Sequence, residues 1–406
     1  AIESGLIDRL GSIDTQVGGE SSRYSLSAQY NSDTLNASLY AIDTDLTLFS
    51  NFTYFLDNPE TGDQFEQADD RKIYGGELST TLPFAVTQGS SITLGGQWRY
   101  DDIGNVGLYR TQNLERLSTI REDAIDSSSY AAFAQSNIVL SDSLTLSLGG
   151  RYDYFDIEVD SQIAANSGDE KDGMFSLKAG LKYQYTDTMT MFANIGQGYH
   201  SNDARGVTIT QDPTTGESIA SAPLLVRSLG YETGINWTDN KTYNVSAALW
   251  QLELDSELVY VGDAGFTEAS RPSKRYGLEV SAYYWLSHHL TADIEAAYTK
   301  ARFSDTVAGE GDHIDGTVPA VVSAGATWYQ QRNQQGFSYT LRARYLSSRT
   351  VDSFDTIEPP STFLLNTQVA YQDTDWQIGL EVLNLLDSDA HDIDYYYASR
   401  LPGEPE

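Results

Sequence analysis

The fold is decided by residues 273–303, which read SKRYGLEVSAYYWLSHHLTADIEAAYTKARF. They form two alternating segments on either side of a polar turn at residues 287–289. In each segment most alternate residues are apolar or aromatic, and the residues between them are mainly small, polar or acidic. A period of two is typical of β-strands, whose successive side chains point to opposite faces. The stretch therefore predicts a hairpin with an apolar face that includes Tyr276, Leu278, Val280, Tyr284 and Ile294, and a polar face that includes Glu279, Ser281, Asp293 and Glu295.

Two kinds of protein present such a hairpin. In a soluble two-layer protein the apolar face packs on a second sheet. In an outer-membrane barrel it faces lipid, the polar face lines the lumen, and aromatic side chains lie at headgroup level. The segment from Tyr276 to Tyr284 is about 26 Å long. Tilted by about 40°, it covers roughly 20 Å of membrane height, close to the ~25 Å apolar band of such barrels. The hairpin alone leaves both alternatives open.

Composition narrows the class of protein. The 406 residues include no cysteine, which excludes a disulfide framework and thiolate metal sites. Lys and Arg number 25 against 58 Asp and Glu, and the net charge of −33 argues against nucleic-acid binding. No apolar run approaches the ~18–20 residues of a transmembrane helix, so strands must do any membrane crossing. Residues 1–14 lack the charged and apolar segments of a secretory signal, so we expect a fragment or a processed chain.

The order of turns and loops favours the barrel. Along the chain, short polar turns, such as residues 141–142 and 186–187, alternate with longer connections, expected at 104–125, 200–222 and 255–272 among others. Outer-membrane barrels place short turns on the periplasmic side and long loops outside, whereas a sandwich mixes loop lengths. No segment has a helical period. The pattern predicts an all-β, transmembrane, antiparallel up-and-down barrel.

Several stretches resemble the barrel of TonB-dependent outer-membrane receptors. Residues 380–387, LEVLNLLD, resemble the family's near-terminal signature, with Leu386 where Phe is usual. Glu232 and Gly234 match its Glu-x-Gly strand, and Gly277 and Glu279 match its Gly-x-Glu strand. Residues 195–206 and 391–400 also resemble segments of proteobacterial members. Together the matches follow the expected order over residues 20–400.

The resemblance implies a barrel of roughly 22 strands around a plug, with a TonB box before the plug. Counting back from residues 376–386 as the penultimate strand makes residues 23–30 about the sixth strand. We therefore expect about 16–17 of the roughly 22 strands, with residues 1–406 forming a partial barrel domain. The TonB box, the plug, the first strands and the closing strand are expected to be absent from this chain.

The function that the resemblance implies is TonB-dependent active import across the outer membrane of a Gram-negative bacterium. The expected ligand is a ferric siderophore or another metal chelate, and the expected partners are the TonB complex, through the missing N-terminal part, and outer-membrane lipid and lipopolysaccharide. No cofactor is expected. Two alternatives stay open: a passive porin-like channel, and a soluble extracellular β-sheet adhesion protein. No Gly-x-Ser-x-Gly, His-Glu-x-x-His or phosphate-loop motif occurs, so no enzyme is expected.

Candidate site residues fall into two groups. The polar faces supply a predicted lumen wall of Arg151, Lys178, Glu279, Asp293, Glu295, Arg342 and Arg344. The outer connections supply predicted ligand contacts: His200, Asn202, Asp203, Arg205, Tyr260 and Phe266. Arg and Asn can hydrogen-bond an anionic chelate, His or Asp can meet its metal, and the two rings can stack on it. Each group has an alternative without a ligand. The wall residues would form ion pairs with one another, the residues from His200 to Arg205 would hold the loop in its fold, and Tyr260 and Phe266 would pack against the protein or the membrane interface. No resident metal site is expected.

The two faces of the hairpin make a direct prediction. Arginine at Val280 or Ile294 should cost about 2–4 kcal/mol near the bilayer midplane, because the charge would face hydrocarbon. Arginine at Ser281 should cost much less, because that side chain faces the lumen. Unfolding free energies of the intact barrel in lipid would measure both costs, and equal costs at the two faces would contradict the assignment.

Overall fold

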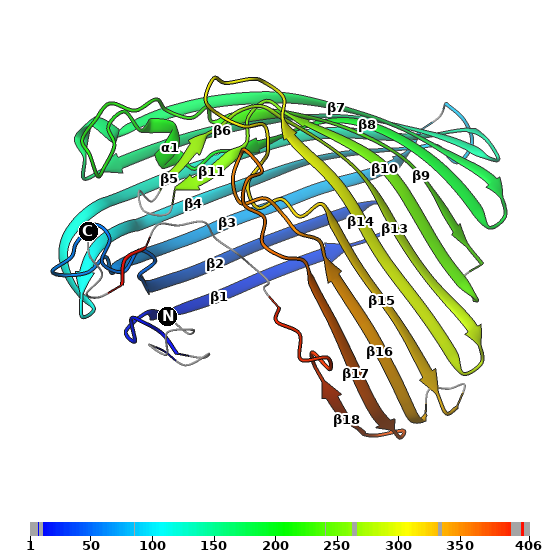
Figure 1. The fold of residues 1–406 in the computed structure, drawn as a ribbon. Helices are drawn as coiled ribbons and strands as arrows, with labels where there is room; N and C mark the ends of the chain where they lie inside the picture. Colours follow the sequence, from blue (N-terminus) through cyan, green and yellow to red (C-terminus); the bar gives the residue numbers. More distant parts are fainter. Residues whose placement is uncertain are drawn as a thin grey trace.

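The computed structural model describes residues 7, 11–84, 86–239, 241–261, 266–331, 335–390 and 399–401, with backbone alone for 258–261 and 266–269. One 16-stranded sheet dominates them, and its strands neighbour one another in chain order. Neighbouring strands of this sheet are antiparallel, as in β13 with β14 and β16 with β17. The sheet curves into an incomplete cylinder with β1 and β18 as its edges (Figure 1). The prediction of about 16–17 antiparallel strands is confirmed.

The strands of the sheet have the following bounds: β1 Gly18–Asn31, β2 Leu35–Ser50, β3 Phe65–Pro83, β4 Ser91–Gln112, β5 Glu115–Ser141, β6 Leu144–Ser161, β7 Gly168–Thr186, β8 Met189–Ser201, β9 Leu225–Thr238, β10 Tyr243–Leu254, β13 Ser273–Ser287, β14 Leu290–Phe303, β15 Ala320–Tyr329, β16 Gly336–Leu346, β17 Thr362–Gln372 and β18 Gln377–Val382. Outside it lie a short ribbon of β11 (Leu258–Val261) and β12 (Phe266–Ala269), a helix α1 (Ala204–Thr208) and a 3-10 turn η1 (Ala164–Asn166).

The connections alternate in length as expected, except for the short outer turn between β4 and β5. One end of the sheet, here called the inner end, carries short turns such as residues 142–143 and 288–289. The other end, the outer end, carries long connections such as residues 202–224 and 304–319. Among the described residues, no helix is long and apolar enough to cross a lipid bilayer.

Two expectations were wrong in detail. The loop expected at 104–125 is a continuation of β4 and β5, which meet at a tight turn where Asn113 and Leu114 have φ of 53° and 68°. The missed signal was the alternation that continues through Arg121, Asp123 and Ile125. The expected absence of helix is corrected by α1 and η1, which are too short to produce a helical period. Residues 391–398, part of one family-like stretch, lie outside the described residues.

The hairpin at 273–303 has the register that its sequence predicts. Val280 pairs with Ala296, Ser281 with Glu295, and Ala282 with Ile294. Paired residues share a face, so the register can be followed from strand to strand. It joins the apolar face of this hairpin to Leu249 on one side and to Val322 on the other. The same steps, repeated around the sheet, define one apolar face and one polar face.

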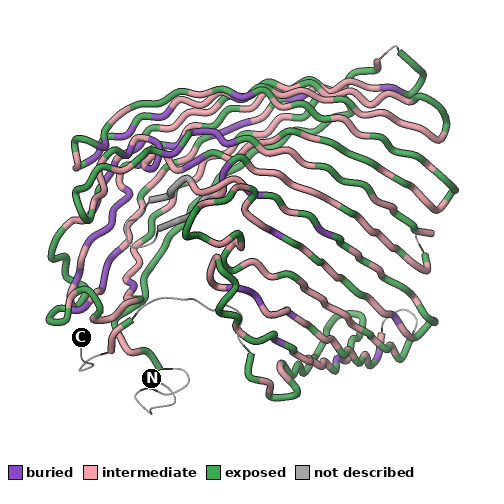
Figure 2. Tube along the Cα trace, turned by 45° about the horizontal axis from the view of Figure 1, so that its top comes forward, coloured by how far each residue is buried: buried purple, intermediate pink, exposed green. Residues whose placement is uncertain are grey.

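Burial distinguishes the two faces. Side chains of the apolar face are exposed, for example Leu26, Leu78, Leu177 and Leu278. Within the span of the sheet the polar face holds many buried residues, for example Asp101, Ile125, Asp153, Ile157, Thr291 and Ala370. Burial is greatest toward the outer ends of β4–β6 (Figure 2). The apolar face is therefore the convex surface that membrane lipid can cover, and the polar face lines the interior.

The turn between β4 and β5 offers a test of the backbone. A left-handed leucine costs about 1–2 kcal/mol, so Leu114→Gly should leave the free energy of unfolding unchanged or raise it. Leu117→Gly, at an exposed strand position, should lower it by about 0.5–1 kcal/mol. Denaturant titration in lipid vesicles would compare them, and equal losses would contradict the turn geometry.

Candidate functional site

A hollow opens on the polar face across β2–β6. Its volume is about 270 Å³, and β8 adds one side chain to it from the outer end of the sheet. The polar and aromatic lining residues include Tyr40, Glu77, Gln97, Arg99, Arg151, Asp153, Phe155 and Tyr199. The hollow therefore combines two guanidinium groups with aromatic rings inside the curved sheet.

Each arginine of the hollow is held by a carboxylate two residues along its own strand. Arg99 donates from Nε and Nη2 to Asp101 at 2.7 and 2.6 Å, and Arg151 donates from Nε to Asp153 Oδ1 at 2.8 Å. The Asp153 side chain is only 3% exposed, whereas Arg99 is 49% exposed. A guanidinium has five N–H donors, so each arginine keeps donors available for an anionic ligand.

The same spacing recurs on four neighbouring strands. Asp69 with Arg71 on β3 and Arg121 with Asp123 on β5 form ion pairs like those of Arg99 and Arg151. A period of two places both partners of each pair on one face. Of these arginines only Arg151 was predicted at the lumen. The Arg-x-Asp or Asp-x-Arg spacing is the sequence signal that could have identified the others.

Tyr199 reaches the hollow because β8 leaves β7. Pairing between β7 and β8 ends at Lys178 with Gly196, whereas β8 and β9 stay paired as far as Ser201 with Leu225. Beyond that point the Tyr199 ring packs edge-on against Phe155 of β6, with centroids 5.9 Å apart. No local sequence pattern marks this departure.

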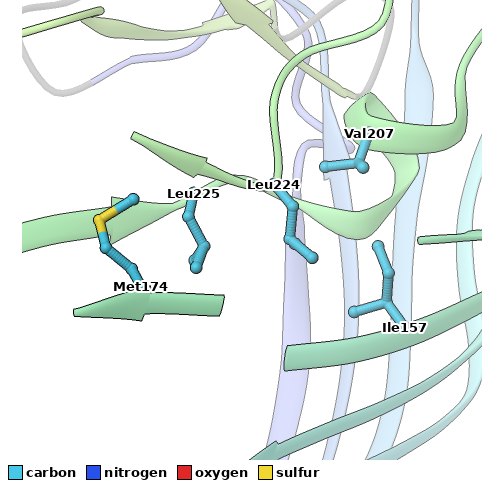
Figure 3. Packing of buried hydrophobic residues seen from close by; sticks show 5 residues of the cluster. All are labelled: Ile157, Met174, Val207, Leu224 and Leu225. Carbon is cyan, nitrogen blue, oxygen red and sulfur yellow. The ribbon is translucent and has the colours of Figure 1, made fainter. Parts of the chain in front are cut away.

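An apolar cluster fixes the outer ends of these strands. Leu224 and Leu225 pack with Ile157 of β6, Met174 of β7 and Val207 of α1 (Figure 3). All five side chains are buried. The outer ends of β8 and β9 and the short helix are thereby held against the polar face of β6 and β7.

Of the predicted ligand contacts, Asp203 and Arg205 are used by the protein itself. Asp203 caps α1 by accepting from the Arg205 backbone N–H at 2.9 Å, and its second oxygen lies 2.6 Å from Arg205 Nη2. Arg121 donates to the Arg205 carbonyl at 3.2 Å. Burial alone would raise the pKa of Asp203, but the hydrogen bonds and charge of Arg205 hold that pKa below its usual value. This arrangement matches the loop-folding alternative.

His200 and Asn202 lie beside this pair. Asn202 is 6% exposed, and its side-chain nitrogen donates to the Pro223 carbonyl. Within the described part of the chain, His200 Nε2 and Asn202 Oδ1 are buried without a hydrogen-bond partner. Their role as ligand contacts stays a prediction. Tyr260 and Phe266 lie on β11 and β12, but their side chains are outside what the structure describes.

The register places all seven predicted wall residues on the polar face. Arg151 is paired with Asp153, and Arg342 lies 2.8 Å from Asp293. Glu279 and Glu295 border a second hollow of about 530 Å³ together with Glu232. Lys178 and Arg344 are exposed on the same face. Their role as the wall of a working lumen stays a prediction. Over the described ranges, no cluster of three or more His, Asp or Glu side chains has an arrangement that could hold a metal ion.

Comparison with known proteins identifies the fold. Residues 4–385 match the family described as TonB dependent receptor-like, beta-barrel. The chain is 23% identical over 323 residues to the rhizobactin receptor of Rhizobium meliloti (strain 1021), which covers 71% of this chain and 40% of that protein. It is 23% identical over 257 residues to the ferrioxamine receptor of Yersinia enterocolitica, which covers 61% of this chain and 34% of that protein. The chain thus spans less than half the length of these relatives.

A solved structure supports the same fold. The copper transporter OprC superposes with a TM-score of 0.72 at 15% identity, over 92% of this chain and 61% of that one. At this identity the likeness shows the architecture alone.

The capped helix makes a pH prediction. Because the pKa of Asp203 is lower in the folded protein than in the unfolded chain, its contribution to stability is present above about pH 4 and is lost as the pH falls through the lowered pKa. Protease cleavage within residues 202–224 should therefore stay slow down to about pH 4 and accelerate below it. The protease should cleave the Asp203→Asn variant faster than the parent at neutral pH, and its cleavage rate should no longer rise in acid.

Asp160→Asn is the matched control, because Asp160 is an exposed carboxylate on β6. The protease should cleave this control variant at the same rate as the parent at every pH. The same profile for Asp203→Asn and the parent would contradict a stabilising Asp203–Arg205 pair.

Proposed function

Because the chain belongs to the family of TonB dependent receptor-like β-barrels, which lie in the outer membrane of Gram-negative bacteria, we propose that it forms the wall of an active importer of ferric siderophores. The relatives support this ligand class, since two of them are named for rhizobactin and ferrioxamine. The chain covers 40% and 34% of those proteins. The activity is therefore proposed for the whole protein of which residues 1–406 supply barrel strands.

The single observation that carries the ligand assignment to this chain is the hollow with Arg99 and Arg151. Ferric siderophores present negatively charged oxygens around the metal, and guanidinium groups bind such oxygens through charge-assisted hydrogen bonds. Tyr40 and Tyr199 add hydroxyl groups and aromatic surface at the same place.

The negative net charge of the chain does not prevent an anion from binding in the hollow. A chain of −33 repels an anion at long range, but ionic screening confines most of that repulsion to about 8 Å at physiological salt. Inside the hollow the nearest charges decide the outcome. Asp101 and Asp153 hold the two guanidinium groups in place, and they are largely buried beneath them. The arginines therefore present their charge to a ligand more openly than the carboxylates do.

The proposed cycle assigns a task to each part. The outer connections, including the segment fixed by α1, capture the chelate, and the arginines of the hollow hold it at the lumen wall. A plug supplied by the rest of the protein then rearranges when the TonB complex pulls on it, and the chelate passes through the lumen. The partners are accordingly the siderophore, TonB, and the surrounding lipid and lipopolysaccharide.

Paired substitutions in the whole protein test the hollow. Arg99→Gln with Asp101→Asn, and Arg151→Gln with Asp153→Asn, remove a guanidinium without leaving a buried carboxylate unpaired. Each should weaken the binding of ferric ferrioxamine or ferric rhizobactin about tenfold or more, because a hydrogen bond to a charged group contributes about 1.5–3 kcal/mol. Equilibrium binding to the purified receptor measures the loss.

Arg342→Gln with Asp293→Asn is the matched control. This ion pair lies on the same face but outside the hollow, and the net charge again stays unchanged. The affinity of this control variant for the ferric siderophore should equal that of the parent. Equal losses in all three variants would contradict a specific role for the hollow, and solute flux that continues without TonB would support a passive channel instead.

A further inference from the structure

A groove of about 730 Å³ crosses the apolar face of β4–β9, opposite the arginine hollow. Small residues widen it, among them Ala134, Gly150 and Ala179. Leucine and isoleucine side chains border it, among them Leu148, Leu177, Ile195 and Leu229. We propose that the groove holds an acyl chain of lipid A from the outer leaflet, with the carbonyl of that chain hydrogen-bonded to Gln197.

Gly150 lines the groove on β6, and neighbouring side chains approach its backbone closely. A Cβ at this position would lie 3.3 Å from the Phe175 ring and 3.5 Å from Leu177. These two side chains therefore lie close over the position that a Cβ would occupy, and a glycine permits this close approach. Gly150 pairs with Ala134 on β5 and with Leu177 on β7, so these three lining residues lie side by side across three strands of the groove.

The end of the β7–β8 pairing places a polar group at the groove. The last residues paired between these strands are Lys178 and Gly196, and Gln197 follows directly. Its Oε1 accepts a hydrogen bond from the backbone N–H of Leu177 at 3.2 Å. The carboxamide thus occupies the seam where the ladder stops, and its Nε2 hydrogens remain available to a bound molecule.

A carboxamide on a lipid-covered face needs an acceptor. An amide in hydrocarbon without a hydrogen-bond partner is unfavourable, and hydrocarbon chains alone offer none. The ester and amide carbonyls that join acyl chains to a lipid headgroup are the acceptors found at that depth. A groove with an apolar length and one donor therefore matches an acyl chain that carries a carbonyl at its head.

The height of Gln197 points to the outer leaflet. The segment from Met189 at the inner end of β8 to Gln197 is about 26 Å long, which at a tilt of about 40° gives roughly 20 Å of height. This lies near the outer limit of an apolar band of ~25 Å. A chain whose carbonyl meets Gln197 would run inward past Ile195 and Leu148 toward the bilayer centre. The outer leaflet of a Gram-negative outer membrane supplies lipid A for this position.

The test uses the whole receptor, extracted from outer membranes in mild detergent and examined by native mass spectrometry. The parent should retain one lipid A after washing. Ala179→Trp, which fills the groove, should lose it, and Gln197→Leu should reduce its occupancy about fivefold through the lost hydrogen bond. Unchanged retention in both variants would overturn the proposal.

Ala343→Trp is the matched control, because Ala343 lies on the apolar face of β16, far from the groove in strand order. It should retain lipid A like the parent. Siderophore affinity should stay unchanged in all variants, so that a failure of the groove is separable from a failure of the proposed import function. A retained phospholipid, or a dimer that Ala179→Trp dissociates, would replace lipid A as the occupant and overturn the proposal.

A photoreactive leucine analogue at Leu148 gives a second measurement that needs no groove-filling side chain. In vesicles with lipopolysaccharide in the outer leaflet it should crosslink to lipid A. If Leu148 crosslinked to phosphatidylethanolamine, in vesicles of that lipid alone, with the same yield as to lipid A, the assignment to lipid A would be overturned.

Discussion

The continuous antiparallel ladder from β1 to β18 is the constraint on which the rest of the structure depends. Lipid offers no hydrogen-bond partner to a backbone, so each strand in the wall must be satisfied by its neighbours. Once the register is set, every side chain is assigned to one of two faces, and a shift by one residue would exchange them. The pairing of Val280 with Ala296 and of Ser281 with Glu295 shows this assignment at the centre of one hairpin.

The ladder also explains the charged groups of the interior. Residues two apart on a strand share a face, so an arginine and an aspartate at that spacing meet without help from another strand. Arg99 with Asp101 and Arg151 with Asp153 are held in this way. Because the buried carboxylates fix the guanidinium groups before any ligand arrives, little side-chain order remains to be imposed on binding.

The point at which β7 and β8 stop pairing affects both faces of the sheet. Where β8 separates from β7 after Gly196, its outer end packs over β6, and Tyr199 enters the arginine hollow. On the opposite face the same separation leaves Gln197 at the edge of an apolar groove. The ligand-facing and lipid-facing features of this region therefore have a common structural origin.

The sequence by itself determined the architecture, because a period of two and the alternation of short turns with long connections are local properties that a strand must display. It determined the face of residues such as Glu279 and Arg342 for the same reason. Only the tertiary structure decided which outer residues meet. Asp203 caps a helix that contains Arg205 and is too short to leave a periodic pattern, and Tyr199 joins Arg151 across an intervening strand. Some of these contacts join segments far apart in the chain, and others depend on where the pairing of two strands ends. The spacing of neighbouring residues predicts neither property.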